Sequence, residues 1–251
     1  MKELTITLIN MFTNKTILVT GGSSGIGEVA ALMFAQNGAD VAITYKSNKE
    51  GADNVVEKIK KLGQKAIAIQ ADLIYENEAK SVIDVVIKEF GKIDILVNNA
   101  GRYIAGDEWN GPSDIWMKSL QQNLISTMNV SKYAIKIFQK QQSGIMINIA
   151  SRCGLDGQYD IISYAAAKAG VINITQAYAK LLSPFGRANS ISPAAVNAGY
   201  WLSASKEETE KMLANKPNHK FIEPETIAKK IIFLASDEAN NITGQNFSII
   251  E

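Results

Sequence analysis

Tyr164 and Lys168 lie four residues apart, so a helix would place a phenol and an ammonium on one face. A phenol is a poor acid at neutral pH because its unperturbed pKa is about 10. An ammonium one helical turn away favours the phenolate, and we therefore expect Lys168 to lower the pKa of Tyr164. A tyrosine of lowered pKa can exchange a proton with a reacting alcohol or carbonyl. Taken alone, most Tyr-x-x-x-Lys pairs are ordinary neighbours on a solvated helix.

A glycine-rich turn near the start of the chain has the composition of a phosphate-binding loop. Gly21, Gly25 and Gly27 follow an apolar strand-like run and open a helical pattern. Such glycines permit a tight turn, a close approach of backbone to a pyrophosphate, and close packing of helix on strand. The free N–H groups at the helix start can then bind phosphates. For this motif taken alone, a glycine-rich turn without a ligand is the alternative. The spacing here is G-x-x-x-G-x-G, which differs from the more general G-x-G-x-x-G.

These residues are carried by a regular alternation of strands and helices. Near-continuous apolar runs are typical of parallel strands covered on both faces, and they predict strands at residues 16–20, 41–45, 66–70, 93–97, 145–149 and 189–192. Helices are predicted at residues 25–37, 49–62, 76–90 and 161–182, with a long one ending near residue 141. We expect left-handed backbone just past helix ends at Gly38, Gly63, Gly91, Gly144 and Gly186.

The alternation predicts an α/β fold, a single-domain doubly wound (Rossmann) parallel sheet with helices on both faces. We assign residues 1–12 to an N-terminal extension and residues 13–251 to the domain, with Met11 as an alternative start. No run approaches the ~18 consecutive apolar residues of a membrane span. The first ten residues lack the cleavage site of a signal peptide.

Composition excludes several classes of function. Of the 251 residues, 46% are hydrophobic and 20% charged, which is ordinary for a soluble globular protein. The formal net charge of +1 gives no basic field for nucleic acid. The single cysteine, Cys153, excludes an intrachain disulfide and suits a reducing cytoplasm. The single histidine, His219, excludes a multi-histidine metal site, and we expect no metal and no membrane partner.

Several motifs then follow one another in the order of a known family. They are TGGSSGIG at residues 20–27, QADL around Asp72, NNAG at 98–101, NL at Asn123, NIAS at 148–151, YAAAK at 164–168 and FLASDEANNITGQ at 233–245. From about Thr13 to Gln245 the chain resembles the short-chain dehydrogenase/reductases, especially their 3-oxoacyl-carrier-protein-reductase-like branch. The ordered set is far more specific than any one of its members.

The resemblance implies a hydride transfer between a nicotinamide cofactor and a carbonyl or secondary alcohol. Tyr164 would donate the proton in reduction, or accept it in oxidation, while Lys168 would hold the ribose hydroxyls. Ser151 would hydrogen-bond the substrate oxygen, and Asn123 would anchor a water that links Lys168 to solvent. The structural alternatives are a strand-end hydroxyl for Ser151 and a polar residue in mid-helix for Asn123.

The resemblance also implies a cofactor site. In it Asp72 would contact the adenine, Asn98 would brace the central strands, and Ala100–Gly101 would line the nicotinamide ribose. A helix cap for Asp72 and a polar strand end for Asn98–Asn99 are the alternatives. The whole implied set is Gly21, Ser23, Ser24, Gly25, Ile26, Gly27, Tyr45, Lys46, Ser47, Asn48, Asp72, Leu73, Asn99, Ala100, Gly101, Tyr164, Lys168, Pro193 and Val196.

The turn after the second strand decides between NAD and NADP. An acidic residue there would hydrogen-bond a ribose 2′-hydroxyl and repel a 2′-phosphate. Here Tyr45 occupies the place where NAD-preferring relatives usually carry Asp, and Lys46, Ser47 and Asn48 can donate to a phosphate. NADP is therefore favoured over NAD, and we expect no carboxylate to oppose the phosphate. Ser24 counts against this, because many NADP-preferring relatives have Arg or Lys there.

The chain departs from the family pattern at the substrate end. Ala194 follows Pro193 where relatives usually have Gly, and Ala198 stands where a Thr commonly holds the nicotinamide carboxamide. Residues 102–103, 152–159 and 198–217 should shape the pocket, the last as a mobile lid with an amphipathic helix around residues 201–213. Arg102 and Arg152 are either surface residues or contacts for a polar or anionic substrate.

Two classes of function stay open at this point. One is an NADP-dependent carbonyl reductase or alcohol dehydrogenase acting on a small-molecule substrate, and the other is a nucleotide-binding regulatory protein with little turnover. The family resemblance also implies a homo-oligomer, a tetramer or else a dimer. Its long helices would pair through apolar faces that include Val130, Ile135, Ile172 and Ala177.

Overall fold

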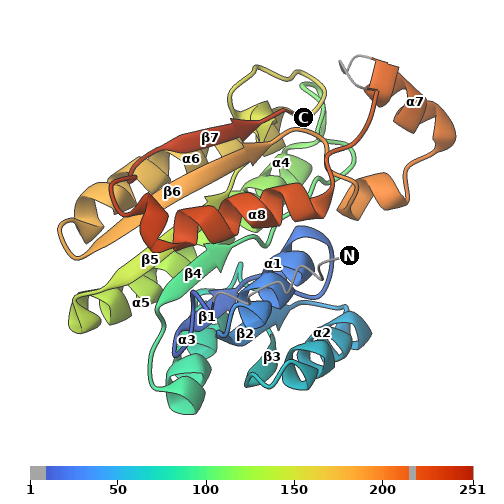
Figure 1. The fold of residues 1–251 in the computed structure, drawn as a ribbon. Helices are drawn as coiled ribbons and strands as arrows, with labels where there is room; N and C mark the ends of the chain where they lie inside the picture. The colour runs from blue at the N-terminus through green and yellow to red at the C-terminus, as the bar shows by residue number, and fades with distance from the viewer. Residues whose placement is uncertain (1–9, 215–218, 251) are drawn as a thin grey trace.

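Seven parallel strands form a single sheet in the order β3-β2-β1-β4-β5-β6-β7 (Figure 1). The computed structural model describes residues 10–214 and 219–250, so residues 1–9 of the predicted extension and 215–217 of the predicted lid lie outside it. The strands are β1 (Thr16–Val19), β2 (Asp40–Tyr45), β3 (Ala66–Gln70), β4 (Ile95–Asn98), β5 (Gly144–Ile149), β6 (Gly186–Pro193) and β7 (Asn246–Ile249).

Helices cover both faces of this sheet (Figure 1). They are α1 (Gly25–Gln36), α2 (Lys49–Lys61), α3 (Glu76–Phe90), α4 (Ser113–Leu120), α5 (Ser126–Gln141), α6 (Ile162–Leu182), α7 (Lys206–Ala214) and α8 (Pro224–Ala235). Helices α1, α2 and α8 pack into one core, while α3, α5 and α6 pack into the other. Within the described ranges, no helix is both long and apolar enough to cross a bilayer.

The two cores follow from the alternation of side chains along each strand. In β1, Ile17 and Val19 belong to the core under α1 and α8, whereas Leu18 belongs to the core under α3 and α5. All four residues of this strand are buried, as expected for a central parallel strand covered on both faces. The predicted fold class, a doubly wound sheet with helices on both faces, is therefore confirmed.

Residue 12, which the sequence assigned to the extension, packs into the domain. Phe12 is buried, and its ring meets Phe34 of α1 edge-on with the centroids 5.0 Å apart. The backbone N–H of Phe12 also donates to the carbonyl of Asn37 at the end of α1. These contacts tie the residue to the packed core.

The predicted left-handed glycines divide into two groups. Gly38, Gly63 and Gly91 follow α1, α2 and α3 with φ of +90°, +86° and +79°, which confirms the prediction. Gly144 and Gly186 instead begin β5 and β6, so the prediction is wrong for them. A Cβ on Gly144 would lie 2.1 Å from the ring of Phe138, and one on Gly186 would lie 2.5 Å from the carbonyl of Gly144. Close packing explains both glycines.

The predicted long helix ending near residue 141 is formed by three consecutive segments. Helix α4 passes through a π-helical turn, Gln121–Ile125, directly into α5. Such π-turns inside helices are frequent at functional sites, and this one holds Asn123. On α5, Val130 and Ile135 are buried inside the chain, so their predicted place at a subunit contact is wrong.

Candidate active site

A cavity of about 1300 Å³ opens beyond the carboxyl ends of the strands. This is where parallel α/β sheets bind ligands, at the point where the strand order reverses, here between β1 and β4. The predicted cofactor residues line it with the exception of Gly27, and so do Ser151, Tyr164 and Lys168. The fold thus brings together residues that are up to 175 positions apart, from Gly21 to Val196.

The glycine turn forms the floor of the cavity in the way the sequence predicts. Gly21 and Gly25 have φ of +64° and +57°, which other residues rarely adopt. A Cβ on Gly27 would lie 2.3 Å from the carbonyl oxygen of Gly21, so this glycine lets α1 approach the turn. At the N-cap of α1, Ser24 makes no side-chain capping bond. The first N–H groups of α1 therefore fit a cofactor pyrophosphate.

Two threonines that the sequence analysis left without a role hold this turn. The hydroxyl oxygen of Thr44 accepts from the N–H of Gly21 at 3.1 Å. The hydroxyl oxygen of Thr20 accepts from the N–H groups of Asn99 and Ala100, each at 3.0 Å. The signal for them was a threonine at the carboxyl end of an apolar strand, next to the glycine turn.

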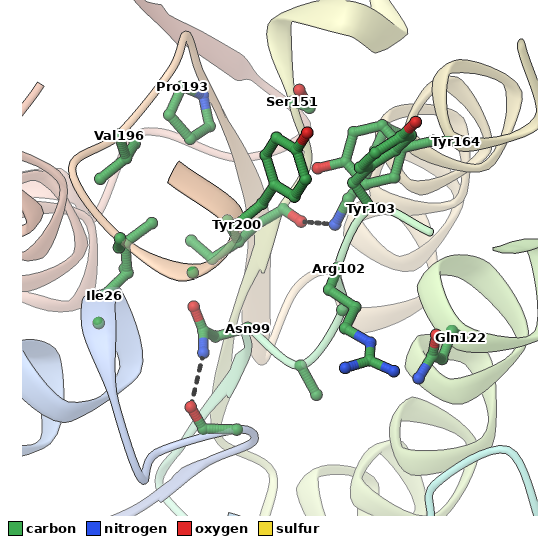
Figure 2. Close-up of a pocket in the computed structure, with 18 of the residues that line it drawn as sticks. Ile26, Asn99, Arg102, Tyr103, Gln122, Ser151, Tyr164, Pro193, Val196 and Tyr200 are labelled. Carbon is green, nitrogen blue, oxygen red and sulfur yellow. Dashed lines mark hydrogen bonds between the residues drawn. The ribbon is translucent and has the colours of Figure 1, made fainter. Parts of the chain in front are cut away.

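The Asn98–Asn99 pair braces the centre of the sheet. Asn98 donates to the Ser131 hydroxyl at 2.9 Å and to the Asn148 side chain at 2.8 Å, which joins β4 to α5 and β5. Asn99 donates to the carbonyls of Thr20 and Gly21 at 3.0 Å each, as one dashed line in Figure 2 shows. The bracing role expected of Asn98 agrees with these bonds.

The turn after β2 differs from the expectation of free phosphate donors. Asn48 caps α2, because its side chain accepts from the N–H of Gly51 and donates to the carbonyl of Ser23, both at 3.1 Å. The ammonium of Lys46 forms an ion pair with Asp72 at 2.7 Å. The expectation that no carboxylate lies near this turn is therefore wrong, because β3 lies beside β2 and carries Asp72 just past its end.

Tyr164 lies at the opposite end of the cavity, near the start of α6. Burial raises its pKa to about 12, and the neighbouring Cys153 adds to that effect, while a hydrogen bond with the Ser151 side chain opposes it. The prediction that Lys168 lowers the pKa of Tyr164 is wrong for this structure, because desolvation of the phenolate dominates. The phenol is consequently protonated at neutral pH. In Figure 2, Ser151 and Tyr164 lie at the same end of the pocket.

Lys168 is one turn further along α6, and only 4% of its surface is exposed. Its ammonium donates to the carbonyl of Ile149 at 2.8 Å and lies 5.7 Å from the centre of the Tyr164 ring. Burial lowers the pKa of Lys168 to about 8. Cys153 is half-buried, and burial raises the pKa of its thiol, which agrees with a packing role.

Asn123 lies behind the cavity wall, fully buried in its π-turn. Its side-chain N–H donates to the carbonyls of Arg102 at 2.9 Å and Ser119 at 3.0 Å. Its amide oxygen has no hydrogen-bond partner among the described residues. A Cβ on Gly101 would lie 2.6 Å from this oxygen and 3.4 Å from the Lys168 ammonium, so both polar groups border the space left by this glycine.

Aromatic side chains close the substrate end. Tyr103 meets Tyr200 edge-on with ring centroids 5.2 Å apart, and Tyr200 meets Trp201 at the same distance. Tyr200 and Trp201 belong to a short 3₁₀ turn, Gly199–Leu202, which precedes α7. The predicted lid helix is therefore interrupted. Ala198 lies against the glycine turn, since a Cβ on Gly25 would come within 3.1 Å of its Cβ.

The two arginines of this end differ in their contacts. Arg152 donates to the carboxylate of Asp156 at 2.9 Å, and both residues are partly exposed. Arg102 is exposed and points towards Gln122 in Figure 2. Both line the cavity, so the structure allows either the surface role or the substrate role that the sequence left open. The described residues contain no cluster of side chains that could hold a metal ion.

The chain matches known proteins over almost its whole length. A family model described as enoyl-(acyl carrier protein) reductase matches residues 21–249. A 3-oxoacyl-[acyl-carrier-protein] reductase of Staphylococcus aureus is 37% identical over 240 residues, which are 95% of this chain and 98% of that protein. The corresponding reductase of Thermotoga maritima is 34% identical over 236 residues, 94% of this chain and 96% of the relative.

Solved structures agree in fold along almost the full length. A 7α-hydroxysteroid dehydrogenase complexed with NADH and 7-oxo glycochenodeoxycholic acid superposes with a TM-score of 0.90 at 29% identity, covering 97% of this chain and 96% of that one. An NAD⁺-bound xylitol dehydrogenase has a TM-score of 0.88 at 27% identity, covering 95% and 98%. Relatives of this kind do not favour the alternative of a regulatory protein.

Proposed function

The chain belongs to the short-chain dehydrogenase/reductase family and is an NAD(P)-dependent oxidoreductase, and on this basis we propose which of its residues move the proton. The enzyme transfers a hydride between the nicotinamide cofactor and a carbonyl compound or secondary alcohol. The observation that carries the assignment is the contact of the Ser151 side chain with the Tyr164 phenol in the cavity, one helical turn from Lys168. Tyr164 is the proton donor in reduction and the proton acceptor in oxidation.

Each residue of the site has a separate task. When bound, the cofactor supplies or accepts the hydride, and the protein supplies position, a proton and a polar environment. Ser151 hydrogen-bonds the substrate oxygen and orients it towards the Tyr164 phenol. Lys168 holds the ribose hydroxyls of the nicotinamide half. Because the pKa of Tyr164 is raised to about 12, the phenol carries its proton at neutral pH and suits carbonyl reduction.

Asn123 completes the proton path. Its amide oxygen, which has no hydrogen-bond partner among the described residues, and the Lys168 ammonium both lie within 3.4 Å of the place where a Cβ of Gly101 would stand. A buried polar atom without a partner costs about 1–3 kcal/mol. A water that bridges this oxygen and Lys168 would satisfy the atom and link Lys168 to solvent. Lys168 would then be the point from which protons are passed on towards the phenol.

Turnover of carbonyl compounds tests the proposed function directly. We expect steady oxidation of NADPH with at least one member of a panel of simple ketones, cyclic ketones and 3-oxoacyl thioesters. The relatives named above include reductases of 3-oxoacyl thioesters, which is why that class belongs in the panel. Binding of cofactor without turnover of any compound would support the regulatory alternative.

The cofactor of this enzyme is NADP in preference to NAD. Support comes from the turn after β2, which carries the half-exposed Lys46 and the exposed Ser47 and has no carboxylate of its own. A 2′-phosphate would compete with Asp72 for the Lys46 ammonium. Tyr45 is buried in the core with 8% of its surface exposed, so a substitution there would also disturb packing. Lys46 is the cleaner probe.

Lys46→Ala should weaken NADPH binding about tenfold or more and leave NADH binding nearly unchanged. A charged hydrogen bond contributes about 1.5–3 kcal/mol, which is roughly ten- to a hundredfold in affinity. Titration of both cofactors by fluorescence measures this. Lys49→Ala is the matched control, because Lys49 is the first residue of α2, directly after the turn, and pairs with Asp53. Tighter binding of NADH than NADPH by the unmodified protein would contradict the preference.

The enzyme acts as a cytoplasmic homo-oligomer, a tetramer rather than a dimer. Apolar side chains are exposed on the long helices, on α4 at Met117, on the π-turn and α5 at Ile125 and Met128, and on α6 at Ile162 and Leu181. Two-fold symmetric packing is the common way to bury such faces. We expect sedimentation at micromolar concentration to give four times the mass of one chain. A stable monomer would contradict the proposal.

A further inference from the structure

Helix α6, which carries Tyr164, begins without a capping side chain of its own. The residue at its N-cap is Ile161, whose side chain cannot accept a hydrogen bond. The first four N–H groups of a helix have no partner inside the helix and must be satisfied from elsewhere. Counted from the N-cap, these belong to residues 161–164, and the N–H of Ala165 makes the first bond within the helix, to the carbonyl of Ile161. The N–H groups of residues 162, 163 and 164 therefore need other acceptors.

One residue from a distant loop accepts from all three. Asp107 lies in the loop between β4 and α4 and is fully buried. Its backbone carbonyl accepts from the N–H of Ile162 at 2.9 Å. One carboxylate oxygen accepts from the N–H of Ser163 at 3.1 Å and also from the Ser163 hydroxyl, and the other accepts from the N–H of Tyr164 at 2.7 Å.

We infer that Asp107 is the positioning residue of Tyr164. It acts on the proton donor through the backbone of α6, and no motif in the sequence marked it. The same loop meets the segment before α6 a second time, because the N–H of Trp109 donates to the carbonyl of Tyr159 at 2.8 Å. The loop also carries Tyr103 and Glu108, which line the cavity. Asp107 thus joins the wall of the substrate pocket to the start of the catalytic helix.

The inference rests on the proposed role of Tyr164. The substitution Asp107→Asn tests it, because it changes the hydrogen-bonding groups of the side chain and keeps its shape. The amide has the shape of the carboxylate but one oxygen fewer. Whichever way it turns, its –NH₂ group faces a backbone N–H, either that of Ser163 or that of Tyr164. Two donors then oppose each other in a fully buried place, and the start of α6 must move. Lys168 lies a full turn further along the helix and should keep its position.

We expect Asp107→Asn to lower the turnover rate, divided by the concentration of enzyme that binds cofactor, by about ten- to a hundredfold. A displacement of about 1 Å can cost a hundredfold in rate. The dissociation constant of NADPH, measured by fluorescence, should change little. Hydrogen exchange should show lost protection at residues 162–165. Counting turnover per bound cofactor removes the effect of any unfolded fraction, so a merely structural role would leave this ratio unchanged.

Asp94→Asn is the matched control. Asp94 also accepts from a backbone N–H, that of Thr16 at 2.8 Å, but it lies just before β4, away from the cavity. It should keep wild-type turnover per bound cofactor. If Asp107→Asn binds no cofactor, Ser163→Ala removes only the hydroxyl contact and should lower turnover about two- to tenfold.

Three results would overturn the inference. The first is unchanged turnover per bound cofactor in Asp107→Asn, or in Ser163→Ala if Asp107→Asn binds no cofactor. The second is an equal loss of turnover in Asp94→Asn. The third is unchanged exchange protection at residues 162–165 in Asp107→Asn. If the unmodified protein turns over no compound of the panel, the proposed function fails instead. The exchange measurement needs no substrate and still decides whether Asp107 holds the start of α6.

Discussion

Tyr164→Phe should reduce kcat about 10²–10⁴-fold, the contribution usual for a general acid or base. The substitution removes the hydroxyl that we propose gives a proton to the substrate oxygen, and it leaves the ring in place. NADPH should bind with nearly unchanged affinity, because Lys168 and the glycine turn remain. Steady-state kinetics on an active ketone and a fluorescence titration of NADPH measure the two effects separately.

Tyr178→Phe is the matched control for this substitution. Tyr178 lies on the same helix, and burial raises the pKa of its phenol as well. It does not line the cavity, so its loss should leave kcat within about twofold of the wild type. Near-native turnover by Tyr164→Phe on a confirmed substrate would show that another group, or water, supplies the proton.

The fold was predictable where the pattern of apolar residues is strong. Buried central strands such as β1 and β2 are near-continuous apolar runs. The run of β3, at the edge of the sheet, is also apolar enough that its predicted bounds agree with the structure. The apolar pattern did not predict β7, a four-residue strand at the edge of the sheet with largely half-exposed side chains. A short edge strand of this kind lacks the run of buried residues that marks a central one.

Helix α8 was missed although the sequence carries its signal. Pro224 occupies its first turn, where proline is favoured, and Ile227 and Ile231 recur one turn apart on its buried face. Residues 233–245, at and beyond the end of this helix, were instead interpreted only as a family motif. Helix periodicity over residues 224–235 would have placed the element that covers the sheet beside α1.

The positions of the site residues were predictable, but their electrostatics were not. The spacing of Tyr164 and Lys168 shows that they share a helical face, yet it does not show how deeply the phenol is buried. Burial decides the direction in which the pKa of Tyr164 moves. Likewise, Lys46 and Asp72 are 26 residues apart in sequence, and only the pairing of β2 with β3 brings them together.

Lys168→Met should abolish most turnover, weaken cofactor binding, and yet make the free protein more stable at pH 7. The folded pKa of Lys168 is about 8, below the value of about 10.4 in an unfolded chain. Between these two pH values the unfolded chain binds a proton that the folded chain does not, so the stability of the wild type rises with pH. Below pH 8 the buried ammonium costs on the order of 3 kcal/mol. Methionine removes that cost, and denaturant unfolding at pH 7 measures the gain.

The pH dependence separates this effect from a general improvement in packing. The advantage of Lys168→Met over the wild type should be largest below pH 8, fall as pH rises, and vanish above about pH 10.4, where the lysine is neutral in both the folded and the unfolded chain. Lys180→Met on the same helix is the control, because Lys180 is exposed and its removal takes no buried charge out of the fold. A Lys168→Met protein that is less stable than the wild type at pH 7 would mean that the bond to Ile149 outweighs desolvation. In that case Lys168 would increase both the free energy of unfolding and the catalytic rate. There would then be no trade-off between stability and activity at this position.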